Sequence, residues 1–358
     1  MPTLDLTASS ADITRAICDI PSVSDDERAL ADAIQEAIEP LEHLDFHRDG
    51  DTIVARTHRG RGQRVVIAGH IDTVPINDNV PTLDFLLDGE PYIRGRGTVD
   101  MKSGVAVQLK LAAELTDPVV DITWIWYDHE EVAAERSGLT RLAANRPDLF
   151  AGDFAILGEP TNGLVEGGCN GTLRAVVRTH GRRAHSARAW IGENAIHAAA
   201  PILDTLAAYR PQTIAVDGLE YREGLNAVKI SGGVAGNVIP DLCEVEVNFR
   251  FAPSRSEDEA VEHVRSVFDR FEVEITDLSG GARPGLDAPL AQQFLRAVGG
   301  EPRPKYGWTD VARFSKLGVP AVNYGPGDPL LAHHDEERVA VSQIEEVERG
   351  LRAWLSAR

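Results

Sequence analysis

Histidine and carboxylate residues stand at the ends of apolar runs in this chain of 358 residues. His70 and Asp72 follow the run RVVIAG, and in an extended segment residues i and i+2 point the same way. Asp72 can therefore hold the imidazole of His70 and fix its tautomer, as the partner of a metal-ligating histidine does. Glu130 and Glu131 follow the next apolar run, and adjacent carboxylates repel unless they share a cation or a proton.

Three more residues of the same types occupy similar positions. Asp100 lies in a glycine-rich loop before a predicted helix, Glu159 follows a third strand, and His333 belongs to the run AHHDEE. Each has a structural alternative: a histidine hydrogen-bonded in the core, an acidic pair that starts a helix, a turn glutamate, or a solvated charge run over 335–337. Two histidines and at least three carboxylates at strand ends of one sheet together favour a divalent ion such as zinc, cobalt or manganese.

The elements that position these residues alternate between strand and helix. Short apolar runs indicate buried strands, and longer periodic segments indicate helices. The expected helices and strands of this part cover residues 29–38, 64–69, 105–115, 121–128 and 153–158. The alternation predicts an α/β fold with a doubly wound, mostly parallel sheet, whose ligands bind beyond the carboxyl ends of the strands.

The pattern changes between residues 169 and 282. TLRAVVRTHG and CEVEVNFRF alternate strictly between apolar and polar residues, as half-exposed antiparallel strands do. Helices are expected over 195–208 and over 257–268, the second capped by Ser256. We therefore expect a catalytic domain formed by 1–168 and 283–358, with an inserted α+β two-layer domain over 169–282.

Composition excludes several classes of partner. The chain carries 56 acidic and 36 basic residues, a formal net charge of -20, which argues against nucleic acid and anionic membranes as partners. No stretch approaches the ~18 apolar residues of a membrane span, and the first residues lack the pattern of a signal peptide. Three widely separated cysteines form neither a disulfide framework nor a C-x-x-C pair, so we expect a cytoplasmic protein.

Six motifs occur in order along the chain: GHIDTVP, GRGTVDMKSG, the EE pair, GEPT, GRRAHSA and AHHDEE. In this order and spacing they resemble the di-zinc amidohydrolases, which include acetylornithine deacetylase, succinyl-diaminopimelate desuccinylase, aminoacylase and glutamate carboxypeptidase. The resemblance runs from about residue 18 to the C-terminus. It implies two Zn²⁺ ions, for which Co²⁺ can substitute, and a small anionic N-acyl amino acid as substrate.

The resemblance also implies which residues bind the metals. Asp100 bridges the two ions, His70 and Glu159 complete one site, and Glu131 and His333 complete the other. The family has a cis peptide bond after the bridging carboxylate, which here is the bond between Asp100 and the next residue, a methionine. We therefore expect these five side chains to meet at one edge of the sheet.

The catalytic roles implied by the resemblance follow from the chemistry of amide hydrolysis. Two zinc ions that share a water lower its pKa towards neutrality, and Glu130 is the candidate base that moves its proton to the departing amine. Asp72 is counted with the catalytic residues because it orients His70. His185, in GRRAHSA, matches the histidine that reaches the oxyanion from the partner subunit in dimeric relatives, which implies a homodimer.

Candidate substrate residues lie in the inserted domain and in a later loop. Arg250 resembles the arginine that binds the substrate carboxylate in desuccinylases, although it could instead pair across the strands with Glu244 or Glu246. Asn237, in GNVIP, resembles a lid asparagine of the same branch.

The loop GWTDVARF resembles the substrate loop of desuccinylases and adds Thr309 and Arg313 as candidates. It departs from the commoner desuccinylase form because Arg313 lies three residues after Asp310 rather than two. Acetylornithine deacetylases usually carry glutamate in place of Asp310, so the loop favours desuccinylation.

The resemblance therefore favours hydrolysis of N-succinyl-L,L-2,6-diaminopimelate to succinate and L,L-diaminopimelate, a reaction of lysine and diaminopimelate biosynthesis. An acetylornithine deacetylase or another amidohydrolase or peptidase of the family is the alternative within the enzyme class. A non-catalytic relative that binds a ligand on the same scaffold is the alternative outside it. Such a relative would be expected to lose the base or a ligand, and the sequence retains both.

Overall fold

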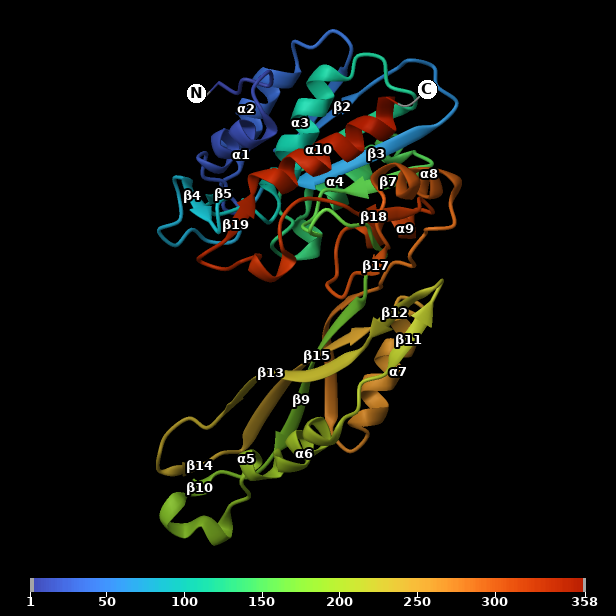
Figure 1. Ribbon diagram of the computed structural model, residues 1–358. Helices are drawn as coiled ribbons and strands as arrows, with labels where there is room; N and C mark the ends of the chain where they lie inside the picture. Colours follow the sequence, from blue (N-terminus) through green and yellow to red (C-terminus); the bar gives the residue numbers. More distant parts are fainter. Residues whose placement is uncertain (1–2, 357–358) are drawn as a thin grey trace. The chain divides into compact units, whose positions relative to one another are not determined.

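The computed structural model describes residues 3–356 and divides into two compact units (Figure 1). The first unit runs up to Gly167 and resumes over Gly285–Arg303 and from Arg313 onward. The second unit comprises Gly168–Pro284 and Pro304–Ala312. The sequence assigns 304–312 to the catalytic domain, whereas in the structure this segment clusters with the inserted residues.

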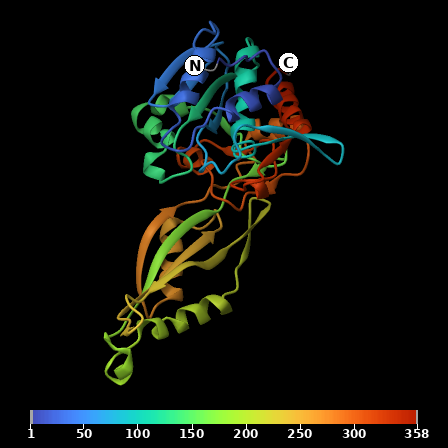
Figure 2. The ribbon, with the colours of Figure 1, turned by 90° about the vertical axis from the view of Figure 1, so that its left-hand side faces the viewer.

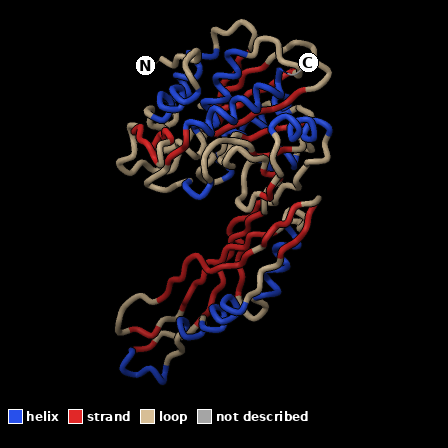
Figure 3. The backbone as a smooth tube through the Cα atoms, in the orientation of Figure 1, coloured by secondary structure: helices blue, strands red, loops and turns tan. Residues whose placement is uncertain are grey.

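The first unit is built on an eight-stranded sheet covered by helices (Figure 3). In spatial order its strands are β1 Asp45–Asp49, β2 Thr52–Arg56, β6 Asp121–Tyr127, β3 Arg64–His70, β7 Phe154–Leu157, β18 Ala321–Asn323, β8 Glu166–Gly167 and β17 Arg303–Pro304. β6, β3, β7 and β18 are parallel, whereas β1 and β2 are antiparallel. The α/β fold with a mostly parallel centre is therefore confirmed.

The helices of this unit pack around that centre. They are α1 Ser10–Cys18, α2 Arg28–Ile38, α3 Lys102–Glu114, α4 Gly138–Asn145, α8 Pro289–Val298, α9 Val311–Lys316 and α10 Val341–Ser356, with short 3₁₀ turns at Ala134–Arg136, Pro147–Phe150 and Pro329–Leu331. α3 contacts β3 and β6, and α1 and α10 contact α3. Every residue of β6 is buried, as expected for a strand covered on both faces.

A three-stranded antiparallel sheet brings distant segments of the first unit together. It pairs β4 Leu83–Leu87 with β5 Glu90–Arg94, and β5 with β19 Arg338–Ala340. Figure 2 shows the β4–β5 hairpin, in cyan, extending from the edge of the unit. Because β19 pairs with β5, the residues that precede β19 lie beside the loop that follows β5.

The second unit is a two-layer α+β structure. Its four-stranded antiparallel sheet has the order β13 Gly224–Gly232, β15 Leu242–Phe251, β9 Gly171–His180 and β16 Glu272–Ser279. Strand pairs β10 Ala184–His185 with β14 Val238–Ile239, and β11 Thr213–Val216 with β12 Leu219–Arg222, complete its strands, and Ser186–Ile191 forms a 3₁₀ turn. Val245, Val247, Phe249 and Phe251 of β15 are buried, which confirms the predicted alternation.

The helices of the second unit are α5 Ala195–Ala198, α6 Ala200–Ala208 and α7 Glu257–Val267. The expected helix over 195–208 is thus divided in two, because Pro201 has no N–H to donate to the preceding turn. α7 begins with the predicted Ser256 cap, which forms a capping box with Glu259. Across the described residues, the helices are too short or too polar to traverse a lipid bilayer.

Candidate metal centre

Four of the five predicted metal ligands meet in the first unit around Asp100. His70 ends β3, Glu131 follows β6, and atoms of His70, Asp100 and Glu131 all lie within 4.8 Å of one another. His70 Nε2 is 3.1 Å from Asp100 Oδ1, while His333 Nε2 is 3.3 Å from Asp100 Oδ2. His333 Nε2 also lies 3.1 Å from Glu131 Oε1. Each Asp100 oxygen therefore faces a different histidine.

Glu159, the fifth predicted ligand, is buried in the loop that follows β7. Leu157 of β7 pairs with Ala68 of β3, and the N–H of Gly158, the residue before Glu159, donates to the carbonyl of Ala68 at 3.0 Å. Helix α3, which follows the Asp100 loop, approaches the same backbone closely. A Cβ added to Gly104 would lie 2.2 Å from the carbonyl oxygen of Gly158, so only glycine allows this approach.

Asp72 is fully buried and organises two parts of the site. Its carbonyl oxygen lies 3.0 Å from His70 Nδ1, and its Oδ1 lies 3.5 Å from the same nitrogen. Its carboxylate accepts the backbone N–H of Glu130 at 3.0 Å and of Glu131 at 3.1 Å. The Ser24 hydroxyl also donates to it at 2.7 Å. Asp72 therefore ties the His70 loop to the loop that carries the paired glutamates.

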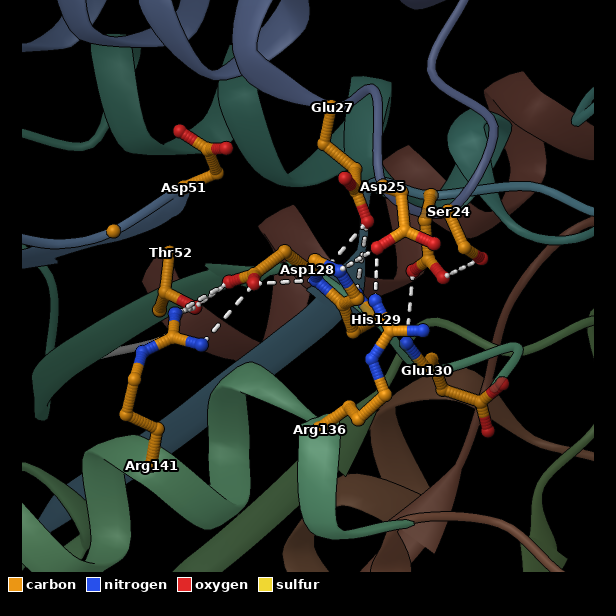
Figure 4. A network of polar contacts seen from close by, with 12 residues as sticks. Ser24, Asp25, Glu27, Asp51, Thr52, Asp128, His129, Glu130, Arg136 and Arg141 are labelled. Atoms are coloured by element: carbon orange, nitrogen blue, oxygen red, sulfur yellow. Dashed lines mark hydrogen bonds and ion pairs between the residues drawn. The ribbon is translucent and has the colours of Figure 1, made fainter. Parts of the chain in front are cut away.

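Figure 4 shows a polar network that anchors the start of the Glu130–Glu131 loop. His129 has a left-handed backbone conformation, with φ of 60°, and its Nδ1 lies 2.7 Å from Asp128 Oδ2. Arg141 donates to Asp128 Oδ1 at 2.7 Å, and Thr52 also donates to this oxygen. The sequence places Asp128 and His129 beside the glutamates, but the anchoring partners Thr52 and Arg141 carry no signal of their own.

In this cluster the histidines and carboxylates each stabilise the charged form of the other. Burial lowers the pKa of His70, but hydrogen bonds to Asp100 and Asp72 outweigh it and hold the pKa well above the ordinary value. Hydrogen bonds to Asp100 and Glu131 raise the pKa of His333 to about 10. The pKa of Asp100 is lowered despite its burial, because both histidines contact it. The site therefore favours positive charge between its carboxylates, and its imidazole and carboxylate donors suit zinc or cobalt.

The predicted His185 and Asn237 are neighbours in the second unit. The Asn237 carbonyl accepts the N–H of Ser186 at 2.9 Å, directly next to the pairing of His185 in β10 with Val238 in β14. The His185 side chain is exposed, and its Nδ1 accepts the N–H of Ala187 at 3.1 Å. A histidine in this position has one ring nitrogen engaged locally, which fixes its tautomer.

The other substrate candidates occupy different places. Arg250, on β15, donates to the Asn248 side chain at 3.1 Å, and burial lowers its pKa. Thr309 is buried, and its carbonyl accepts from Ala312 at 3.1 Å. Arg313 belongs to the first unit, where its guanidinium donates to Thr140 and to the carbonyl of Ala134. Glu244, the alternative partner of Arg250, is hydrogen-bonded at 2.8 Å to an arginine of β9 instead.

The run 335–337 is only partly a solvated charge run. Asp335 and Glu336 are exposed, but Glu337 is buried and accepts the backbone N–H groups of Val99 and Asp100. The solvated interpretation is therefore wrong for Glu337. The peptide bond between Asp100 and Met101 is cis, in agreement with the expectation.

Comparison with known proteins assigns the family. Residues 66–357 match the description Peptidase family M20/M25/M40. The chain belongs to this family. Succinyl-diaminopimelate desuccinylase of Corynebacterium glutamicum is 47% identical over 366 residues, covering 99% of this chain and 98% of the relative. A Mycobacterium tuberculosis protein that carries the same name provisionally is 49% identical over 355 residues, covering 98% of this chain and 99% of the relative.

Solved structures show the same fold. A tripeptidase of Staphylococcus aureus superposes with a TM-score of 0.78 at 19% identity, covering 99% of this chain and 98% of that one. A metallo-carboxypeptidase of Sulfolobus solfataricus superposes with a TM-score of 0.75 at 16% identity, covering 97% and 98%. At these identities the similarity establishes the architecture and leaves the substrate open.

Proposed function

We propose that this chain is a zinc-dependent succinyl-diaminopimelate desuccinylase of the M20/M25/M40 family. It hydrolyses the amide of N-succinyl-L,L-2,6-diaminopimelate to succinate and L,L-diaminopimelate. The observation that carries the proposal is the 47% identity, over nearly the whole of both chains, to the Corynebacterium glutamicum enzyme of that name. The three free cysteines support a reducing compartment, and we place the reaction in the cytoplasm.

The residues around Asp100 fit a pair of divalent ions. We assign Asp100 as the shared ligand, because its two oxygens face His70 and His333 at 3.1 and 3.3 Å. His70 and Glu159 then complete one site, while Glu131 and His333 complete the other. Zinc is the proposed metal, and the same donors accept cobalt. When bound, such ions lower the pKa of a water and polarise the scissile carbonyl.

Glu130 is assigned the proton transfer that amide hydrolysis requires. One water adds across the amide, its oxygen bonds to the acyl carbon, the C–N bond breaks, and Glu130 carries the water's proton to the leaving amine. Asp72 supports this role because it accepts the Glu130 N–H at 3.0 Å and so fixes the backbone that carries the base. The Glu131 N–H, bound to the same carboxylate, holds the adjacent metal ligand in register with the base.

The proposed site also needs a donor for the negatively charged oxygen of the tetrahedral intermediate. We assign this role to His185 of a partner subunit in a homodimer. β13 supports the dimer, because it is an edge strand that exposes apolar side chains: Val228 is 57% and Ile230 50% exposed. Exposed apolar edge strands in soluble proteins favour pairing with another chain. Leu203 of the neighbouring α6 is exposed as well.

Two experiments test the dimer: one introduces a charge on the exposed strand, and the other mixes two inactive variants. Ile230→Asp is expected to convert a dimer into monomers in light-scattering chromatography, while Leu86→Asp on the first unit, at an even more exposed apolar site, leaves the dimer intact. Mixed subunits of His185→Ala and Glu130→Ala are expected to regain activity, since one site of the heterodimer keeps both residues. No recovery despite subunit exchange would mean that His185 acts within its own chain or not at all.

Substrate recognition is assigned to Arg250, Asn237, Thr309 and Arg313. The substrate carries three carboxylates, and burying a carboxylate is costly unless it meets a charged partner. The described hydrogen bond of Arg250 goes to the neutral Asn248 amide, which leaves the guanidinium charge for an anion. Arg250→Ala should lower kcat/KM for the succinyl substrate roughly ten- to hundredfold, with partial rescue by Arg250→Lys.

The decisive experiment compares the rates of several substrates. It also distinguishes the role of Glu130 as a base from that of Glu131 as a metal ligand. The zinc-loaded wild type is expected to hydrolyse N-succinyl-L,L-diaminopimelate far faster than N-acetylornithine or dipeptides. Glu130→Gln should lower kcat by about 10²- to 10⁴-fold and retain its zinc, whereas Glu131→Gln should lose metal. Preference for acetylornithine or dipeptides would replace the assigned substrate. If the protein binds two metals but hydrolyses none of these substrates, the non-catalytic ligand-binding relative becomes the better assignment.

A further inference from the structure

We propose that the buried pair of Glu337 and Arg96 is a positioning element that holds the Asp100 loop in the geometry needed for metal binding. The inference rests on the proposed metal centre and adds two residues that are not themselves metal ligands. Both side chains are almost fully buried in the first unit: Glu337 is 1% and Arg96 4% exposed. Charged side chains with such low exposure are rare unless every charge is paired.

The Glu337 carboxylate is surrounded by donors. Its Oε1 accepts the backbone N–H of Val99 at 2.8 Å and of Asp100 at 3.1 Å, and its Oε2 accepts Arg96 Nη1 at 2.9 Å. Burial raises the pKa of Glu337, but the N–H groups of Asp100, Val99 and Gly97 oppose that shift. Because all of these partners donate, the ionised carboxylate is the form that satisfies them.

Arg96 extends the contact to two more loops. Its Nε donates to the carbonyl of Pro75 at 3.1 Å, in the loop that follows β3, and its Nη1 lies 3.4 Å from the carbonyl of His334. The backbone of Glu337 also accepts the N–H of Gly95 at 3.0 Å. The pair therefore joins the loop that follows His70 to the loops that carry the predicted ligands Asp100 and His333.

The contact to the Asp100 amide makes this pair more than a stabiliser of the fold. A buried ion pair is often no more stabilising than apolar residues of the same volume. Apolar residues, however, would leave the buried N–H groups of Val99 and Asp100 without acceptors, and the loop would have to move to satisfy them. Movement of that loop changes the position of the carboxylate that faces both histidines.

The neighbouring Glu336 provides a matched control. Its side chain is 57% exposed and pairs with Arg94 at 2.8 Å on the surface. Asp121 provides a second control, because it is a buried carboxylate of the same unit that accepts the N–H groups of Arg59 and Arg61. Asp121 begins β6, at the end of the sheet opposite to the metal centre.

The experiment measures zinc affinity of the metal-free protein by competition with a chromophoric chelator, together with kcat, KM and Tm. Glu337→Gln replaces one carboxylate oxygen with an NH₂ group, which then faces an N–H donor of Arg96 or of the Asp100 loop. We expect this change to weaken zinc binding roughly 10- to 100-fold, the range found when a residue that orients a metal ligand is replaced. At subsaturating zinc its kcat should fall similarly while KM stays within about twofold, because substrate contacts are intact. Glu336→Gln should retain wild-type affinity, and Asp121→Asn should lower Tm without changing zinc affinity.

Each result has a defined meaning. Wild-type zinc affinity in Glu337→Gln, or an equal loss of affinity in Asp121→Asn, overturns the inference. A wild type that binds no zinc contradicts the proposed function and is recognised before any variant is made. If Glu337→Gln does not fold, Arg96→Lys serves as the second variant: a lysine keeps the charge but cannot reach all three acceptors. Unchanged zinc affinity in that variant equally overturns the inference.

Discussion

Replacing Asp72 with asparagine tests how strongly the buried carboxylate organises the proposed active site. Its Oδ1 accepts the N–H of Glu130 at 3.0 Å, and its Oδ2 accepts the N–H of Glu131 at 3.1 Å and the Ser24 hydroxyl at 2.7 Å. An asparagine offers one acceptor oxygen and directs an NH₂ group at the other donors. At least one backbone hydrogen bond is therefore lost.

The expected magnitude follows from the charge of the acceptor. A hydrogen bond to an ionised group contributes about 1.5–3 kcal/mol, and about 1.4 kcal/mol corresponds to a tenfold change in rate. Asp72→Asn should therefore lower kcat roughly 10- to 100-fold. KM should change by less than about twofold, since the lost contacts position the base and a metal ligand rather than the substrate.

Steady-state hydrolysis at saturating zinc, with metal content measured on the same samples, provides the assay. Ser24→Ala is the graded comparison, because it removes a single hydroxyl donor and should cost only about 0.5–1.5 kcal/mol, or at most roughly tenfold. The reasoning is refuted if Asp72→Asn retains the kcat of Ser24→Ala and binds a full complement of metal. Loss of metal without loss of kcat per bound metal would also contradict it.

Three other predictions concern the metal and the titrating groups. Chelation of the metal should abolish hydrolysis and lower Tm, with recovery on addition of zinc, because a ligand bound only by the folded state stabilises it; an unchanged Tm would oppose this. Burial raises the pKa of Cys18 to about 12 and of Cys169 to about 11, so a thiol reagent at about pH 8 should label neither before unfolding, and rapid labelling would contradict their burial. Burial and, to a lesser extent, the charge of Arg255 lower the pKa of His263 in the folded protein. As the pH is lowered, the unfolded chain therefore binds a proton at this histidine before the folded chain does. The free energy of unfolding should consequently decrease as the pH is lowered from about 7.5 to about 5.5. His263→Gln should flatten that decline in denaturant titrations, and parallel curves would exclude it.

Much of the fold could be predicted because hydrophobic patterns report local burial. The continuous apolar strand β6 and the alternating strand β15 are read from the sequence alone, since one is covered on both faces and the other on one. The division of the helix over 195–208 at Pro201 also has a visible cause in the sequence. The hydrophobic pattern does not predict the two antiparallel strands β1 and β2, because strand direction depends on pairing partners.

The grouping of the candidate metal ligands can be predicted from the sequence only in part. His70 and Glu131 follow parallel strands, and parallel strands end at a common edge of the sheet. Asp100 follows a strand of the separate three-stranded sheet, so strand pairing between β5 and β19, rather than position in the main sheet, brings it beside His333. The motif order predicts that they meet, whereas the local sequence gives no reason for the contact.

The residue types of the site, their places after strands and the family of the chain could all be predicted from the amino-acid sequence, because these depend on local pattern and on order along the chain. Which of these charges are buried depends on the folded chain. Glu336 and Glu337 are identical neighbours, yet one is exposed and paired on the surface while the other is enclosed by backbone N–H groups and Arg96. The environment of a carboxylate is set by segments hundreds of residues away, and no local pattern encodes that environment.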